Sequence, residues 1–116
     1  LQEESVWGMI GLPMIYHDLG KDSESDAALA ALIEQYGQGW AYNIAYVQAY
    51  RGDLDLAFEW LDKAVETKDG GLSEILSEKL FSNLYDDPRW LPFLRQINYA
   101  PEQLAEIQFD VTLPQL

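Results

Sequence analysis

The amino-acid sequence predicts an all-α protein: two helical hairpins, a cap of short helices and an extended tail. Apolar residues recur at three- and four-residue spacings over most of positions 1–68, which is the period of a helix. A glycine or a glycine-rich turn follows each of the first four apolar stretches, where helices commonly end. With 116 residues, 48% hydrophobic and 23% charged, the chain suits one globular domain.

The first hairpin is expected to begin with a helix over residues 2–18. This helix contains Pro13, which should kink it because proline lacks a backbone donor. Gly20 should end it as a left-handed cap. A second helix over residues 23–36 starts with acidic residues that suit a helix N-terminus, and Gly37 breaks it. We expect these two helices to pack against each other as an antiparallel pair.

The second hairpin follows the same plan. A helix over residues 40–51 is expected to end at Gly52, and Asp53 is a natural N-cap for a helix over residues 54–68. The turn at residues 69–71 stops that helix. The expected organisation is repeat 1 over residues 1–37, repeat 2 over 38–70 and a C-terminal helical cap and tail over 71–116, all within a single domain.

The cap is expected to consist of short helices. Apolar helical pieces lie near residues 72–76 and 78–84. Pro88 and Pro101 each suit the first position of a helix, the first running to about Ile97 and the second to about Ile107. Residues 109–114 alternate apolar and polar side chains, which predicts an extended tail.

The two hairpins align on each other. Gly52 follows Gly20 at the same offset at which Leu61 follows Leu29. A helix–turn–helix period of about 34 residues is typical of tetratricopeptide repeats, in which each hairpin buries its apolar face against a neighbour. The second unit carries the clearer pattern, Ala41-x-x-Ile44-Ala45-x-x-Gln48-x-x-x-Gly52-x-x-x-x-Ala57-x-x-x-Leu61-x-x-Ala64.

This pattern resembles the tetratricopeptide consensus at most positions. It departs at Ala41, where a large aromatic residue is usual, and at Gln48, where tyrosine is usual. The first unit departs at Pro13 and Ser25, where small apolar residues are usual. Its matching positions are Leu12, Tyr16 and Gly20.

A wider resemblance rests on four segments: residues 20–37, 41–61, 68–72 and 86–94. They are similar to the repeat region that ends certain bacterial multidomain signalling proteins. In those proteins a winged-helix DNA-binding domain, a nucleotide cyclase or a protein kinase precedes a TolB-like or tetratricopeptide region. The resemblance implies a sensor or scaffold without catalytic residues, in which residues 86–90 (Asp-Asp-Pro-Arg-Trp) close the stack of repeats.

The composition argues against several classes of partner. The chain carries 20 Asp and Glu but 7 Lys and Arg, a net charge of −13, so it should repel nucleic acids and anionic membranes. No apolar run reaches the ~18 residues of a membrane span. We therefore expect no nucleic acid and no direct membrane contact, and a cytoplasmic location by default, or a periplasmic one if a parent protein spans a membrane.

The sequence offers no pattern for catalysis, a metal or a cofactor. It has no cysteine, and its one histidine, His17, cannot build a multi-histidine metal site. The acidic run at residues 18–26 lacks the glycine and the twelfth-position acid of a calcium loop. Residues 37–39 are too short for a phosphate-binding loop. We therefore predict a non-enzymatic protein without cofactor or metal.

Candidate partner-binding residues lie on the first helix of each hairpin. Tyr42, Tyr46 and Tyr50 recur at four-residue spacing and share a helix face, apart from the core-facing arc that contains Trp40, Ile44 and Val47. In tetratricopeptide repeats this helix lines a concave groove. The resemblance matches Trp7, Ile10, Met14 and His17 of the first unit and Tyr42, Tyr46 and Tyr50 of the second to groove positions, with Asn43 alongside. The candidate partner-binding residues are Trp7, Met14, His17, Tyr42, Asn43, Tyr46 and Tyr50. Packing of these rings in the core, or beneath the tail at residues 109–113, and a small-ligand pocket are the other interpretations.

Two functions follow from these patterns. The first is a protein–protein interaction or sensor module of a larger bacterial signalling or regulatory protein, which binds a peptide or protein in a shallow groove. The alternative is a structural cap that closes a longer stack of repeats. In that case Trp7 and Ile10 of the first helix would face a missing neighbour and favour self-association.

Overall fold

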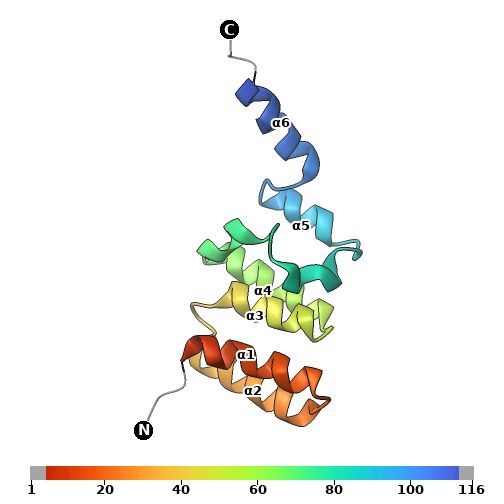
Figure 1. The fold of residues 1–116 in the computed structure, drawn as a ribbon. Coiled ribbons are helices and arrows are strands. Elements are labelled where there is room, and N and C mark those ends of the chain that lie inside the picture. Colours follow the sequence, from red (N-terminus) through yellow and green to blue (C-terminus); the bar gives the residue numbers. More distant parts are fainter. Residues whose placement is uncertain (1–4, 113–116) are drawn as a thin grey trace. The chain divides into compact units, whose positions relative to one another are not determined.

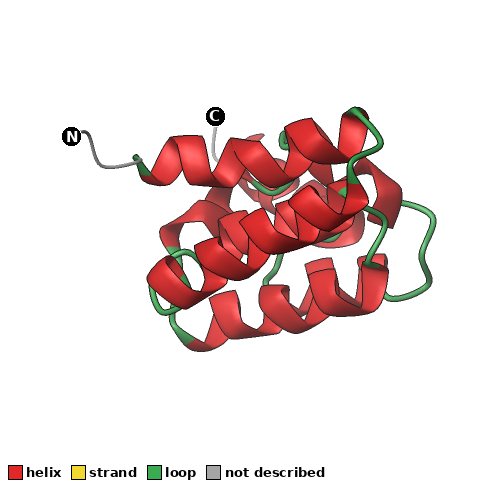
Figure 2. Cartoon of the chain, turned by 90° about the horizontal axis from the view of Figure 1, so that it is seen from below, coloured by secondary structure: helices red, strands yellow, loops and turns green. Residues whose placement is uncertain are grey.

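The computed structural model describes residues 5–112, and their side chains as far as Glu106. Within these residues every regular element is helical, with six α-helices and two 3-10 helices and no strand (Figure 1; Figure 2). The predicted all-α class is therefore confirmed. The chain divides into two compact units, Leu1–Asn83 and Leu84–Leu116.

The first unit contains the two expected hairpins. Helices α1 (Val6–Asp18) and α2 (Asp22–Tyr36) pack against each other, and so do α3 (Ala41–Tyr50) and α4 (Leu54–Glu66) (Figure 1). Helix α1 also contacts α3. The observed ends lie within one or two residues of the predicted ones, except at the start of α1.

Both inner turns are built by the predicted glycines. Gly20 has φ 75° and Gly52 has φ 86°, a left-handed conformation that glycine adopts without steric strain. In each turn the residue after glycine donates its backbone N–H to a carbonyl in the last turn of the helix, which closes a Schellman motif. The two bonds are Lys21 N to Tyr16 O and Asp53 N to Gln48 O, both 2.9 Å.

Helix α1 starts at Val6 because Ser5 caps it. The Ser5 hydroxyl accepts a hydrogen bond from the Gly8 N–H at 3.0 Å, the usual geometry of a serine N-cap. Pro13 lies inside the helix without ending it. Residues 2–4, where the sequence also predicts helix, lie outside the described residues.

Helix α3 is the central helix of the first unit. It is buried around most of its circumference, and its residues Ile44 and Val47 are fully buried, as predicted. Trp40, which precedes the helix and was predicted on the same arc, is only half-buried. The buried residues of α3 are Ala41, Tyr42, Ile44, Ala45, Tyr46, Val47, Gln48 and Ala49.

Two 3-10 helices, η1 (Gly70–Glu74) and η2 (Lys79–Leu84), form the predicted short pieces after α4. The turn into η1 uses Lys68 at φ 57°, and Asp69 N donates to Ala64 O at 2.9 Å. Asn83 donates its side-chain N–H to the carbonyl of Ala49 at 2.8 Å. The same carbonyl also accepts the Gly52 N–H at 3.0 Å, so the Asn83 amide is its second partner at the end of α3.

The second unit contains α5 (Trp90–Gln96) and α6 (Pro101–Thr112). Helix α5 begins two residues later than the sequence predicts. The Asp87 carboxylate accepts the Arg89 N–H at 2.8 Å and holds residues 87–89 in a turn. Buried Trp90 lies against the ring of Tyr85, with centroids 5.3 Å apart.

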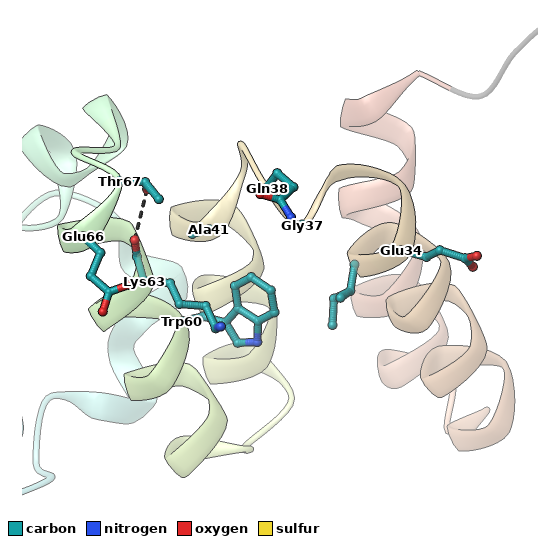
Figure 3. Close-up of a pocket in the computed structure, with 9 residues that line it drawn as sticks. Glu34, Gly37, Gln38, Ala41, Trp60, Lys63, Glu66 and Thr67 are labelled. Atoms are coloured by element: carbon teal, nitrogen blue, oxygen red, sulfur yellow. Dashed lines mark hydrogen bonds between the residues drawn. The ribbon is translucent and has the colours of Figure 1, made fainter.

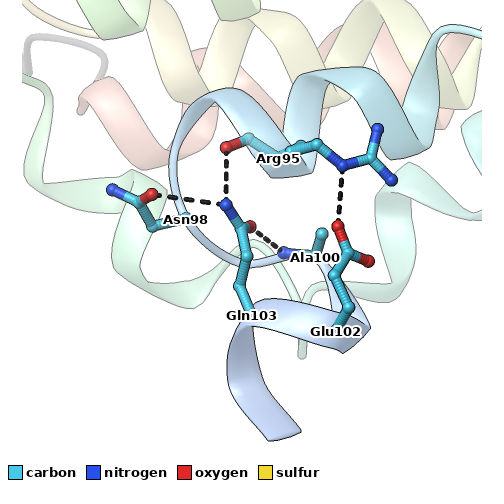
Figure 4. Close-up of polar contacts among 5 residues, drawn as sticks. All are labelled: Arg95, Asn98, Ala100, Glu102 and Gln103. Carbon is cyan, nitrogen blue, oxygen red and sulfur yellow. Dashed lines mark hydrogen bonds and ion pairs between the residues drawn. The ribbon is translucent and has the colours of Figure 1, made fainter. Parts of the chain in front are cut away.

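A hydrogen-bonded connection links α5 to α6 (Figure 4). Gln103 reaches back from the first turn of α6 and accepts the Ala100 N–H at 2.8 Å, as the third residue of a capping box does. Its amide donates to the Arg95 carbonyl at 3.1 Å. Arg95 Nε also donates to a carboxylate oxygen of Glu102 at 2.7 Å. These contacts stabilise the start of α6, which has Pro101 at its first position, as predicted.

The predicted extended tail is wrong over residues 109–112. These residues belong to α6, which continues past Ile107 as far as Thr112. A short alternation of apolar and polar side chains is a weak strand signal, and the described residues contain no strand that could pair with it. A helix already begun at Pro101 extends at little further cost. Residues 113–116 lie outside the described part of the chain.

Candidate functional site

Two of the predicted groove residues, Tyr42 and Tyr46, lie in the core. They are 3% and 7% exposed. Their rings meet edge to face at 5.7 Å, and Phe81 of η2 lies against both, at 5.4 Å from Tyr42 and 6.0 Å from Tyr46. The cover over this pair comes from the same unit. Both rings therefore lie beneath the surface of the first unit and support the residues that form it.

The two buried hydroxyls differ in their hydrogen bonding. The Tyr46 hydroxyl accepts from the side-chain amide of Asn43 at 3.1 Å, whereas the Tyr42 hydroxyl has no partner among the described residues. Burial raises the pKa of both phenols. At Tyr42 the negative charges of Glu78 and Glu74 raise the pKa further.

Three other predicted residues remain partly exposed at the C-terminal end of α1. The Tyr50 hydroxyl donates to both carboxylate oxygens of Asp18, each at 2.8 Å, and this bond raises the pKa of Tyr50. The His17 ring lies edge to face with Tyr50 at 5.9 Å. Met14 is half-buried one turn earlier. These contacts tie the ends of α1 and α3 together.

An open hollow of about 380 Å³ lies near the N-terminal ends of α1 and α3. We call it the Trp7 hollow. It brings together three predicted site residues, Trp7, Tyr42 and Asn43, with segments that the sequence pattern does not assign to the site. The full lining is Trp7, Gly39, Trp40, Tyr42, Asn43, Asp69, Gly70, Gly71 and Glu74.

Trp7 is the most exposed aromatic side chain of this hollow, at 62%. Its indole meets the Trp40 indole edge to face, with centroids 5.2 Å apart, and Trp40 lies against Tyr36 in the same way at 6.4 Å. This chain of rings holds the Trp7 side chain and leaves much of its surface accessible. Rigid, exposed aromatic area of this kind is common at protein interfaces.

The charged residues of the Trp7 hollow are both acidic. Asp69 is fixed in place, because one carboxylate oxygen accepts the Tyr42 N–H at 3.1 Å and the other accepts the Gly71 N–H at 2.9 Å. Glu74 is exposed and pairs with no described residue. The wall at Gly71 is close-packed, because a Cβ there would lie 2.4 Å from a ring carbon of Tyr42.

A second hollow of about 320 Å³ lies between the end of α2 and the side of α4 (Figure 3). It contains its own cation: Lys63 Nζ lies 5.1 Å from the ring centroid of Trp60, a cation–π distance. None of the predicted site residues lies there. The sequence prediction missed it, although Trp60 and Lys63 stand three positions apart on one helix face.

Helix α1 also carries an exposed apolar stripe. Trp7 and Ile15 of α1 and Leu19, its C-cap, are 62%, 54% and 62% exposed, and their spacing in multiples of four places them along one side of the helix. The prediction that Ile10 shares this exposed surface with Trp7 is wrong, because Ile10 is 2% exposed and belongs to the core. Exposed apolar side chains that share one helix face are candidates for an interaction site.

No described residues form a cluster of three or more His, Cys, Asp or Glu that could hold a metal ion. Within the same residues, no helix has both the length and the apolar character needed to cross a membrane. Comparison with models of protein families, with curated proteins and with solved structures finds no match to this chain.

Proposed function

We propose that this chain is a non-enzymatic interaction module of tetratricopeptide type that binds a peptide or protein on the face formed by α1 and α3. It would serve as the sensor or scaffold part of a larger bacterial signalling or regulatory protein. The observation that carries the proposal is the Trp7 hollow, where an exposed indole and two carboxylates from distant segments converge.

Three further observations support this interpretation. The two hairpins are similar in length, and in each of them the same glycine cap forms the turn between the two helices, as expected of repeats. Trp7, Met14, His17, Asn43 and Tyr50 all keep exposed surface on the first helix of a hairpin. Tyr42 and Tyr46, by contrast, would contribute as the packed support of that face.

Photo-crosslinking from defined positions tests the proposal. We would place p-benzoylphenylalanine at Met14 on α1, and at Leu56, which is 41% exposed on α4, as the matched control. A partner crosslinked from Met14 but not from Leu56 in cells of the source organism would support binding on the proposed face. A partner crosslinked only from Leu56, or none from either position, would contradict it.

The apolar stripe of α1 favours a second function. Trp7, Ile15 and Leu19 present a surface that a neighbouring helix would cover, as in a structural element that caps a longer stack of repeats. We then expect self-association of the isolated chain through α1. Light scattering should show a concentration-dependent rise in mass for the wild type but not for the variant Ile15→Ser/Leu19→Ser, and a wild type that stays monomeric would exclude this function.

A further inference from the structure

We infer that the Trp7 hollow binds a lysine or arginine side chain from a basic segment of a partner protein. This inference rests on the proposed function and specifies the chemistry of the partner. Its support comes from the charge of the hollow, from its exposed indole, and from an equivalent contact elsewhere in the same unit.

The charge of the hollow favours a cation. Asp69 and Glu74 line it, and no Lys or Arg is among the lining residues. The cation Arg51, at the other end of α3, is engaged in ion pairs with Asp26 and Asp53. The whole chain carries a net charge of −13, which attracts basic segments from a distance.

The two carboxylates differ in a way that suits a binding site. Asp69 is held by two backbone N–H groups, so its position is set before a ligand arrives and little ordering is needed on binding. Glu74 is exposed and makes no ion pair with a described residue, so its charge is available. Tyr42 also lines the hollow, and its buried hydroxyl makes no hydrogen bond within the described residues.

The indole of Trp7 adds a surface for the cation. A Lys or Arg head group near a Trp ring is attracted to the negative face of the ring. The second hollow contains such a contact between two residues of this chain, where Lys63 lies over Trp60 (Figure 3). Trp7 receives no such cation from the described residues, although it is far more exposed. A partner side chain could therefore make at Trp7 the contact that Lys63 makes at Trp60.

A pair of peptides tests the inference directly. Gly-Ser-Gly-Arg-Gly-Ser-Gly and the same peptide with citrulline for arginine differ in charge and hardly in shape. We would titrate each into the ¹⁵N-labelled chain and follow the indole N–H of Trp7, assigned with Trp7→Phe, together with the amides of Gly70 and Gly71. We expect the arginine peptide to shift these signals to saturation and the citrulline peptide to bind about fivefold or more weakly.

A charge-matched pair of variants separates the hollow from general attraction to an acidic protein. Glu74→Gln and Glu59→Gln change the net charge equally, and Glu59 is exposed on α4, away from the hollow. We expect Glu74→Gln to weaken the arginine peptide about threefold, a modest change because the site is exposed, and Glu59→Gln to leave it unchanged. Equal binding of both peptides, no shift at Trp7, or equal effects of the two variants would overturn the inference.

The same variants distinguish this inference from the proposed function. If a partner crosslinks from Met14 equally well in the wild type and in Glu74→Gln, the proposed interaction face is supported and the inferred recognition of a cationic side chain is wrong. If the arginine peptide binds at Trp7 with the expected charge dependence while no partner crosslinks from Met14, the inference stands and the proposed face is wrong.

Discussion

Ser25 donates its buried hydroxyl to the carbonyl oxygen of Pro13 at 2.7 Å, across the interface between α2 and α1. These are the two positions at which the first hairpin departs from the tetratricopeptide pattern. The hydrogen bond explains why a hydroxyl is tolerated where a small apolar residue is usual: a buried hydroxyl needs a partner, and Pro13 supplies one. The acceptor is a backbone carbonyl, which any residue at position 13 would offer, so the bond accounts for Ser25 and not for the proline.

Removal of the Ser25 hydroxyl should destabilise the first hairpin. We expect Ser25→Ala to lower the free energy of unfolding by about 1 kcal/mol, the typical contribution of a neutral hydrogen bond. Ser23→Ala, at an exposed position of the same helix, is the control and should change it little. Urea denaturation followed by circular dichroism measures both, and equal effects would show that the bond does not contribute.

A side chain at Gly71 should force the buried Tyr42 ring out of place. A Cβ at Gly71 would lie 2.4 Å from Tyr42 Cδ2, whereas a Cβ at Gly70 would meet no atom within 4 Å. Because Phe81 also packs against the ring, we expect Gly71→Ala to lower the unfolding free energy by about 1–3 kcal/mol. Gly70→Ala should be close to the wild type in the same urea titration, and the reverse order would contradict this packing.

The hydroxyls of Tyr42 and Tyr46 should differ in their contribution to stability. Tyr46→Phe removes the acceptor of the Asn43 amide and should lower the unfolding free energy by about 0.5–1.5 kcal/mol. Tyr42→Phe removes a buried hydroxyl without a partner among the described residues, so stability should stay the same or rise. Thermal unfolding of both variants beside the wild type gives the comparison, and a larger loss in Tyr42→Phe would refute it.

The Asp87 carboxyl should titrate at low pH. Side-chain and backbone hydrogen bonds from Arg89 lower the pKa of Asp87 to about 2, from an ordinary value of about 3.9. The folded carboxyl thus binds a proton less readily than the unfolded one. Its stabilising contribution is complete above about pH 4 and is lost as the pH falls towards 2.

Carboxyl ¹³C chemical shifts measure this titration directly. Arg89→Gln should return the midpoint of Asp87 towards its ordinary value. Arg95→Gln is the cross-control: it should leave Asp87 alone and raise the midpoint of Glu102, whose pKa is held low chiefly by the hydrogen bond from Arg95. If the titration midpoint of Asp87 is the same in Arg89→Gln as in the wild type, the contact between Arg89 and Asp87 does not form in solution.

The sequence predicted the hairpins well because their signals are local. Apolar periodicity located four helices, and Gly20 and Gly52 marked turns in which glycine adopts positive φ. The equivalent residues after α4 and α5, Lys68 and Asn98, also have positive φ. Non-glycine residues seldom adopt positive φ. The sequence therefore did not predict a turn of the Gly20 and Gly52 kind at Lys68 or Asn98.

The candidate site was predicted only in part because its walls come from separate segments. A helical period shows that Tyr42, Tyr46 and Tyr50 share a face. It does not show that Phe81 of η2, three connections further along the chain, covers two of them. For the same reason the sequence indicates Asp69, at the end of the second hairpin, only as part of a turn. The one available signal was the apolar stretch around Phe81, which needs a partner to bury it.

The burial of α3 has a consequence for dividing the chain into pieces. A fragment that stopped at Thr67 would hold every residue of both hairpins, yet it would lack the Asp69 carboxylate at the start of α3, the Phe81 ring over its tyrosines and the Asn83 amide at its end. Its central helix would then expose two aromatic rings and lose a hydrogen-bond partner at each end. The shortest piece that can fold by itself should therefore extend through Asn83, so the repeat period is a poor guide to where this protein can be cut.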